Sequence, residues 1–76
     1  MGQMIKRGKE LIRINPTNKT KIEYSSNDGR SWHTRYSGSF CGEFTDLQDN
    51  GIEILGSTSK GLYYSTNDGR SWHKRS

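Results

Sequence analysis

Cysteine, proline and apolar residues are all scarce in this chain of 76 residues, which has one cysteine, one proline and 28% hydrophobic residues. A single cysteine cannot form a disulfide within the chain. Without such a staple, a core of this size seldom supplies more than about 3–5 kcal/mol. Two independent cores would each be too small to fold. We therefore expect one domain over residues 1–76, and self-association stays open as a further source of burial.

Runs of like charge and long apolar runs are also missing. The net charge of +4 is interspersed with acidic residues, which favours a solvated, mildly basic surface over a nucleic-acid footprint, so we regard nucleic acid as an unfavoured partner. The N-terminal residues contain no apolar core of a signal peptide, and nothing approaches the length of a membrane span. These absences predict a cytoplasmic protein that makes no contact with a membrane.

What the sequence does contain is an internal repeat. Residues 24–35 recur forty positions later as residues 64–75, with ten of the twelve positions identical. Upstream of this segment, both copies have short apolar runs separated by turn signals in the same order. Self-similarity of this kind indicates two copies of one supersecondary unit. We place the repeats at about 3–37 and 43–76, with a linker at 38–42.

Short runs of β-branched and aromatic residues alternate with Gly and Asn turn signals along both repeats. Asn-Gly, Asn-Asp-Gly and Asn-Pro favour turns because Gly and Asn tolerate positive φ. No window has the helical spacing of apolar residues. The pattern predicts an all-β protein of two four-stranded antiparallel meanders, packed as a small sandwich or shared within an oligomer. The expected strands cover about 4–6, 11–14, 21–25 and onward from 32, then 44–47, 52–57, 62–65 and onward from 72.

Alternation along these strands predicts the buried face of each meander. The expected inward set is Ile12, Ile14, Ile22, Tyr24, Trp32 and Tyr36 in the first copy, with Ile52, Ile54, Leu62, Tyr64 and Trp72 in the second. The expected outward set is Arg13, Glu23, His33, Arg35, Glu53, Tyr63, His73 and Arg75.

A spaced pattern of small polar residues ends in each tryptophan: Ser25, Asn27, Gly29, Ser31 and Trp32, then Ser65, Asn67, Gly69, Ser71 and Trp72. It resembles the Asp-box, the bacterial neuraminidase repeat of sialidase-type β-propellers, whose pattern is Ser-x-Asp-x-Gly-x-Thr-Trp. Asn stands for Asp here, and its oxygen can still accept bonds from turn N–H groups. The resemblance implies propeller-blade-like units and a structural role for these ten residues. Two blades are fewer than the four to eight that close a propeller. This leaves a monomeric two-sheet sandwich, an oligomeric propeller shared by several chains, or a fragment of a longer protein.

The outward set supplies five candidates for ligand contact: His33, Arg35, Tyr63, His73 and Arg75. Duplication alone explains the spacing of the two histidines, and a catalytic pair would need unlike environments. We therefore assign no catalytic residue and expect no cofactor. The acidic turn residues do not follow the spacing of a calcium loop, and Cys41 has no second cysteine at metal-ligand spacing. No metal site is predicted.

The sequence leaves three classes of function open. The favoured class is a non-catalytic Asp-box repeat module for protein or carbohydrate interaction or for assembly. The first alternative is a small glycosidase- or ribonuclease-like enzyme, because Asp boxes also occur in small microbial ribonucleases. The catalytic set of sialidases does not map onto Arg13, Glu53 and Tyr63 position by position. The second alternative is a weak nucleic-acid binder through a basic face, with an affinity that falls steeply with salt.

Overall fold

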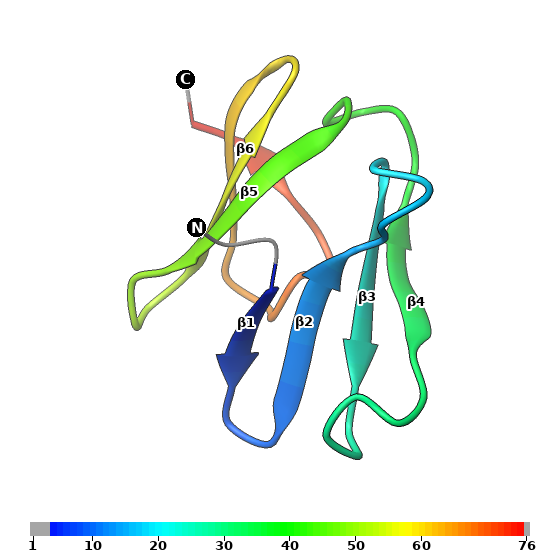
Figure 1. Cartoon of the computed structure of the whole chain (residues 1–76). Coiled ribbons are helices and arrows are strands. Elements are labelled where there is room, and N and C mark those ends of the chain that lie inside the picture. The colour runs from blue at the N-terminus through cyan, green and yellow to red at the C-terminus, as the bar shows by residue number, and fades with distance from the viewer. Residues whose placement is uncertain (1–3, 76) are drawn as a thin grey trace.

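The computed structural model describes residues 4–75, which form two antiparallel sheets and, within that range, no helix. The first sheet has the order β1-β2-β3-β4 and the second β5-β6-β7-β8, which confirms the all-β fold and the two four-stranded meanders. The strands are β1 (Met4–Arg7), β2 (Glu10–Ile14), β3 (Lys21–Ser25), β4 (His33–Ser37), β5 (Phe44–Asp49), β6 (Ile54–Thr58), β7 (Gly61–Ser65) and β8 (His73–Lys74). In Figure 1 the first sheet runs from blue to green, and β5 and β6 of the second lie beside it.

The apolar core lies between the two sheets, which meet where β1 and β2 pack against β5. Its buried members are Ile12, Ile14, Ile22, Cys41, Phe44, Leu47, Ile54, Tyr63 and Trp72. The first sheet contributes aliphatic side chains and the second contributes most of the aromatic ones. The rings of Phe44 and Trp72 have centroids 5.0 Å apart. Aromatic pairs at this separation add to the gain from buried area.

The face that reaches this core differs between the two repeats. Directly paired residues on neighbouring strands share a face of the sheet. In the first sheet Ile12 pairs with Tyr24, and both lie on the core side. We call this side of a repeat, marked by Tyr24 or Tyr64, the tyrosine face. In the second sheet the opposite side, marked by Trp72, reaches the core. We call that side the tryptophan face.

The tryptophan face of the first repeat consequently points away from the core. There Arg13 pairs with Glu23 across the strands, and the Arg13 guanidinium carbon lies 4.0 Å from the centroid of the Trp32 ring. Trp32 is half-buried, whereas Trp72 is 4% exposed. The repeats thus stack front to back: the tyrosine face of the first covers the tryptophan face of the second. Each repeat leaves its other face outside.

The predicted faces are correct for the first-copy isoleucines, for Ile54 and for Trp72, and they are wrong for several other residues. Trp32 lies outside, as do Leu62 and Tyr64, which are half-buried on the outer side of the second sheet. Tyr63 lies in the core at 3% exposure. Glu53 is on the predicted outer side, bound to Arg75, although it is only 8% exposed. The prediction assigned the same inward face to both copies, whereas front-to-back stacking buries opposite ones. Ile52 is 80% exposed because it lies in a turn before β6 begins at Ile54.

A register shift in the first sheet moves one further residue from the predicted outer side. The pairing of β3 with β4 shifts between Ile22 and Glu23, and leaves Arg35 without a paired position on β3. An extra residue of this kind redirects side chains at that point of the strand. The Arg35 guanidinium carbon lies 3.9 Å from the centroid of the Tyr24 ring, on the tyrosine face. Its side chain is only 5% exposed.

Candidate functional site

The two Asn-Asp-Gly turns are held by a hydrogen-bond network around a buried serine. In the first turn Ser25 Oγ accepts from the backbone N–H of Asn27 at 3.3 Å and of Gly29 at 2.8 Å. Asn27 Oδ1 accepts from Ser31 N at 3.0 Å, and Asn27 Nδ2 donates to Ser31 Oγ at 3.0 Å. The amide therefore uses its acceptor and its donor within the turn. A carboxylate would supply only acceptors.

The second turn repeats this network. Ser65 Oγ accepts from Gly69 N at 2.9 Å, and Asn67 Oδ1 accepts from Ser71 N at 2.9 Å. The residue between Asn and Gly has a left-handed backbone in both turns, with φ of 64° at Asp28 and 63° at Asp68. Asn and Asp tolerate this region better than other non-glycine residues. The serine, asparagine and glycine residues of both turns thus take part in the hydrogen bonds that hold the turn.

The surroundings of the two turns differ even though their internal bonds match. A methyl group built on Gly69 would lie 3.6 Å from Ile22 Cγ2 and 3.9 Å from Arg35 Cδ, both in the first repeat. One built on Gly29 would meet only Trp32 and Leu11, within its own repeat. The second turn is thus packed against the first sheet. The first turn lies on an outer surface, and Asp28 is exposed there.

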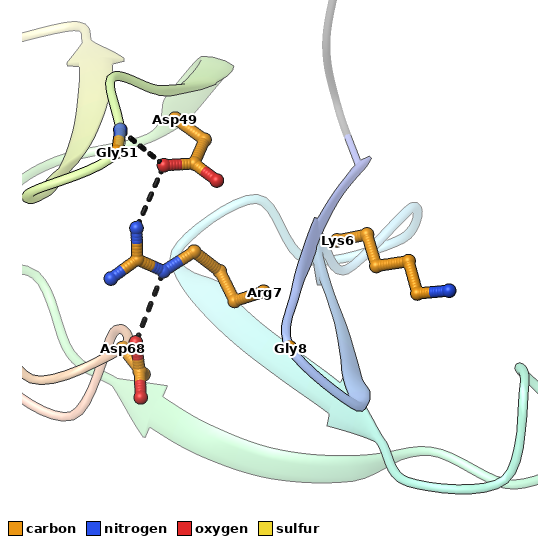
Figure 2. A pocket seen from close by; sticks show the side chains of 6 residues that line it. All are labelled: Lys6, Arg7, Gly8, Asp49, Gly51 and Asp68. Atoms are coloured by element: carbon orange, nitrogen blue, oxygen red, sulfur yellow. Dashed lines mark hydrogen bonds and ion pairs between the residues drawn. The ribbon is translucent and has the colours of Figure 1, made fainter.

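A depression of about 390 Å³ opens where β1 meets the second repeat, and Arg7 occupies its centre. Arg7 Nη1 lies 2.7 Å from Asp49 Oδ1, and Arg7 Nε lies 3.1 Å from Asp68 Oδ1. Figure 2 shows the guanidinium between the two carboxylates and Lys6 pointing away from them. A hydrogen bond from Gly51 N–H lowers the pKa of Asp49, and the Arg7 guanidinium lowers it further. With its donors committed to two carboxylates, Arg7 joins the repeats, and we assign no ligand to the depression.

A second ion pair lies beside the first on the same seam. Arg35 binds Glu10 with two bonds of 2.6 and 3.0 Å, a bidentate arrangement that fixes both groups. Arg35 Nη1 also donates to the backbone oxygen of Asp68 at 3.3 Å. The hydrogen bond from Arg35 is the largest cause that lowers the pKa of Glu10. Arg35 therefore connects its own repeat to the turn of the second repeat.

These carboxylates make the stability of the fold sensitive to acid. A carboxylate whose pKa is lowered in the folded state stabilises that state above its ordinary pKa, and this contribution is lost as the pH falls through the folded value. We expect the urea midpoint of unfolding to hold between pH 7 and 5 and to fall below about pH 4. Glu10→Gln should lower the midpoint at pH 7 and flatten the fall. Glu43→Gln, at an exposed carboxylate, is the matched control, and an equal flattening there would contradict the assignment.

The outer side of the second sheet carries a copy of the Arg35 arrangement. The Arg75 guanidinium carbon lies 4.2 Å from the centroid of the Tyr64 ring, and Arg75 Nη1 lies 2.6 Å from Glu53 Oε1. The rings of Tyr64 and His73 have centroids 5.5 Å apart at 37°. Tyr24 and His33 have the same separation at 38°. The same arrangement of arginine, tyrosine and glutamate therefore lies at the seam in one repeat, with the Arg35 side chain 5% exposed, and on an outer side in the other, with the Arg75 side chain 43% exposed.

The five residues predicted to contact a ligand are divided between these two environments. His73 and Arg75 lie together around Tyr64 on the outer side of the second sheet. Arg35 and Tyr63 are buried, at 5% side-chain and 3% residue exposure, so the single chain does not present them to a ligand. His33 pairs directly with Tyr24 and therefore lies on the tyrosine face, not on the opposite side as predicted, and it is exposed there. The two histidines thus belong to different sheets.

The lone thiol is buried, and the described residues hold no cluster of metal-ligating side chains. Cys41 is fully buried, and burial raises the pKa of its thiol. Its sulfur lies 3.6 Å from Tyr36 Oη, and burial raises the pKa of Tyr36 to about 12. Residues 4–75 contain no group of three metal-ligating side chains. No helix in this range could cross a membrane.

Of the residues that join the repeats, Arg35 was among the predicted site residues, whereas Arg7, Asp49 and Asp68 were not. Arg7 and Asp68 are 61 positions apart, a separation at which sequence spacing gives no signal. The chain matches no family model, and no curated protein and no solved structure matches it.

Proposed function

We propose that this chain is a non-catalytic Asp-box-type β-repeat module that binds protein through its two outer sheet faces. The observation that carries the proposal is the front-to-back stacking of the repeats. It leaves outside one tryptophan face, with Trp32 half-buried, and one tyrosine face, with Tyr64 half-buried. Each is the counterpart of a face that buries apolar area inside the same molecule. Sheet faces of this composition are typical of surfaces that pack against protein.

Protein is favoured over carbohydrate because both outer aromatic rings are already covered. Arg13 lies over Trp32 and Arg75 over Tyr64, at 4.0 and 4.2 Å from the ring centroids. A sugar would have to displace a guanidinium to stack there, whereas a protein can pack around both groups. The ion pairs of Arg13 with Glu23 and of Arg75 with Glu53 hold the guanidinium groups in place.

The proposal is tested with matched variants of the outer faces. Leu62→Arg changes the tyrosine face of the second sheet, and Met4→Arg changes the edge of the tryptophan face of the first. Ile52→Arg places the same substitution in a turn away from both faces. A physiological protein partner should be retained by the wild type and by Ile52→Arg and be lost with one face variant. Partners retained equally by all four forms would overturn the proposal.

Parallel assays address the other classes of function. Fluorogenic glycosides and RNA should not be turned over by the wild type. Turnover that disappears in the His33→Ala/His73→Ala double variant would overturn the non-catalytic assignment. Glycan-array binding that is lost in Leu62→Arg would replace protein by carbohydrate as the ligand. Oligonucleotide binding that weakens steeply with salt would indicate phosphate contacts.

A further inference from the structure

We propose that a second copy of this chain docks head to tail on the first. In this arrangement the outer tyrosine face of one chain's second repeat covers the outer tryptophan face of the other chain's first repeat. The inference rests on the proposed function and names the partner of the same two faces. The stacking of the repeats inside one chain shows how such faces pack, because it already joins one face of each kind.

The outer tyrosine face repeats the polar groups of the buried one. Arg75, Tyr64 and Glu53 reproduce the contacts of Arg35, Tyr24 and Glu10, including a guanidinium about 4 Å from a tyrosine ring and a bidentate carboxylate. In the buried copy this group lies against the other repeat. Its outer copy is 43% exposed at the Arg75 side chain.

The apolar floor of this face is repeated as well. Leu55 pairs with Tyr64 as Ile12 pairs with Tyr24, and Leu62 occupies the place of Ile22 forty residues earlier. Both isoleucines are fully buried at 0% exposure, whereas both leucines are only half-buried. Large aliphatic side chains at these positions gain from a cover that the single chain does not provide.

The outer tryptophan face offers the matching surface. Met4 pairs with Arg13 as Leu47 pairs with Gly56. Leu47 is 3% exposed inside the molecule, whereas Met4 is 54% exposed. Met4 and the half-buried Trp32 are therefore the apolar groups that a docked tyrosine face would cover.

The outer turn supplies a polar contact for the same geometry. Inside the chain Arg35 donates to the backbone oxygen of Asp68, and Arg7 binds the carboxylate of that residue. Asp28 is the equivalent turn residue on the outer surface. It is exposed, and no ion pair within residues 4–75 occupies it. In the head-to-tail contact, Arg75 of one chain meets the Asp28 turn of the other.

This contact would be more polar than the one inside the chain. Arg13 and Glu23 stand where the second repeat has Gly56 and Tyr63. More polar interfaces are typical of partners that also exist apart, whereas obligate interfaces are more apolar. We therefore expect association that depends on concentration. Because the two faces are different, the contact is heterologous and does not stop at two chains.

Sedimentation velocity on the purified full chain tests the proposal. The average mass of the wild-type species should increase with protein concentration and exceed twice the monomer mass of 8.7 kDa. Met4→Arg and Leu62→Arg should each stay at the monomer mass, because each lacks one of the two faces. An equimolar mixture of these two variants keeps one intact face of each kind and should form a dimer and nothing larger. Ile52→Arg should behave as the wild type.

A wild type that stays monomeric up to about 1 mM overturns the head-to-tail contact. This result would not bear on the proposed function, because the capture experiment measures binding to a different protein. Dimers of either single variant alone overturn it too, because they indicate pairing of two like faces. Native folding is checked by the blue-shifted fluorescence of buried Trp72. Where Leu62→Arg fails this check, Arg75→Glu is the second variant of the same face.

Discussion

Trp72→Ala is expected to unfold most of the protein at 25 °C, whereas Trp32→Ala leaves it folded. Trp72 is 4% exposed, contacts Phe44 and donates its indole N–H to the backbone oxygen of Gly69 at 3.1 Å. Truncation of a buried tryptophan costs about 3–5 kcal/mol, which is as much as a core of this size supplies. Trp32→Ala removes chiefly the contact of this half-buried ring with Arg13, which is worth about 1 kcal/mol.

The pair is decisive because the two tryptophans occupy the same position in an almost identical segment. Urea unfolding followed by far-ultraviolet circular dichroism measures both variants without relying on the indole that is removed. Equal losses of stability would contradict the front-to-back stacking, because that arrangement alone makes the two sites unequal.

Phe44→Ala is expected to lower the free energy of unfolding by about 3–5 kcal/mol, as much as Trp72→Ala. Phe44 is fully buried at the start of β5, and its ring lies between those of Trp72 and Tyr36, with centroids at 5.0 and 6.4 Å. Its backbone N–H also donates to the oxygen of Lys19 in the first repeat at 2.8 Å. The side chain therefore fills the space where both sheets meet, and the cavity left by its removal cannot close without moving one of them.

Phe40→Ala is the matched control for this substitution. Phe40 is 61% exposed and contacts the edge of the Tyr63 ring with centroids 5.6 Å apart. Its truncation should cost about 1 kcal/mol, the size of one aromatic pair. Thermal unfolding of both variants measures the difference. A Phe44→Ala protein as stable as Phe40→Ala would contradict the placement of the core.

The strands could be predicted from sequence because their limits depend on local chemistry. The predicted strand 21–25 coincides with β3, and the Asn-Asp-Gly turns were placed correctly because positive φ at Asp28 and Gly29 follows from residue type. The strand predicted at 52–57 begins two residues later, since Asn50 Oδ1 accepts from the N–H groups of Ile52 and Glu53 and extends the turn.

The buried faces could not be predicted in the same way. Both faces of each sheet carry apolar groups, and Tyr63 and Tyr64 are neighbours on opposite sides of one strand, so alternation does not select between them. The buried faces could have been predicted from the positions at which the two repeats differ in residue type. Gly56 and Tyr63 are replaced in the first repeat by Arg13 and Glu23, as expected for positions that are interior in one copy and exterior in the other.

The contacts that Arg7 and Arg35 make between the repeats could not be predicted from sequence, because they form only in the tertiary structure. Arg7 reaches Asp49 and Asp68 only after the sheets have stacked. Arg35 reaches the seam because of a register shift within the first sheet. Neither event has a local signature, so the charges that join the repeats had no distinguishing feature among the 26% charged residues of the chain.

Gly56 stands where the first repeat has Arg13. This difference means that the two repeats could not exchange their places in the chain. A methyl group built on Gly56 would lie 2.8 Å from Phe44 and 3.1 Å from Trp72, so the interior accepts no side chain there. A protein assembled with the second half first would place Arg13 and Glu23 in the interior and leave Gly56 on the outside. Burial of that charged pair would cost several kcal/mol per ion before any compensation. Two halves with a nearly identical turn segment are thus not interchangeable, because each fits only one of the two positions in the stack.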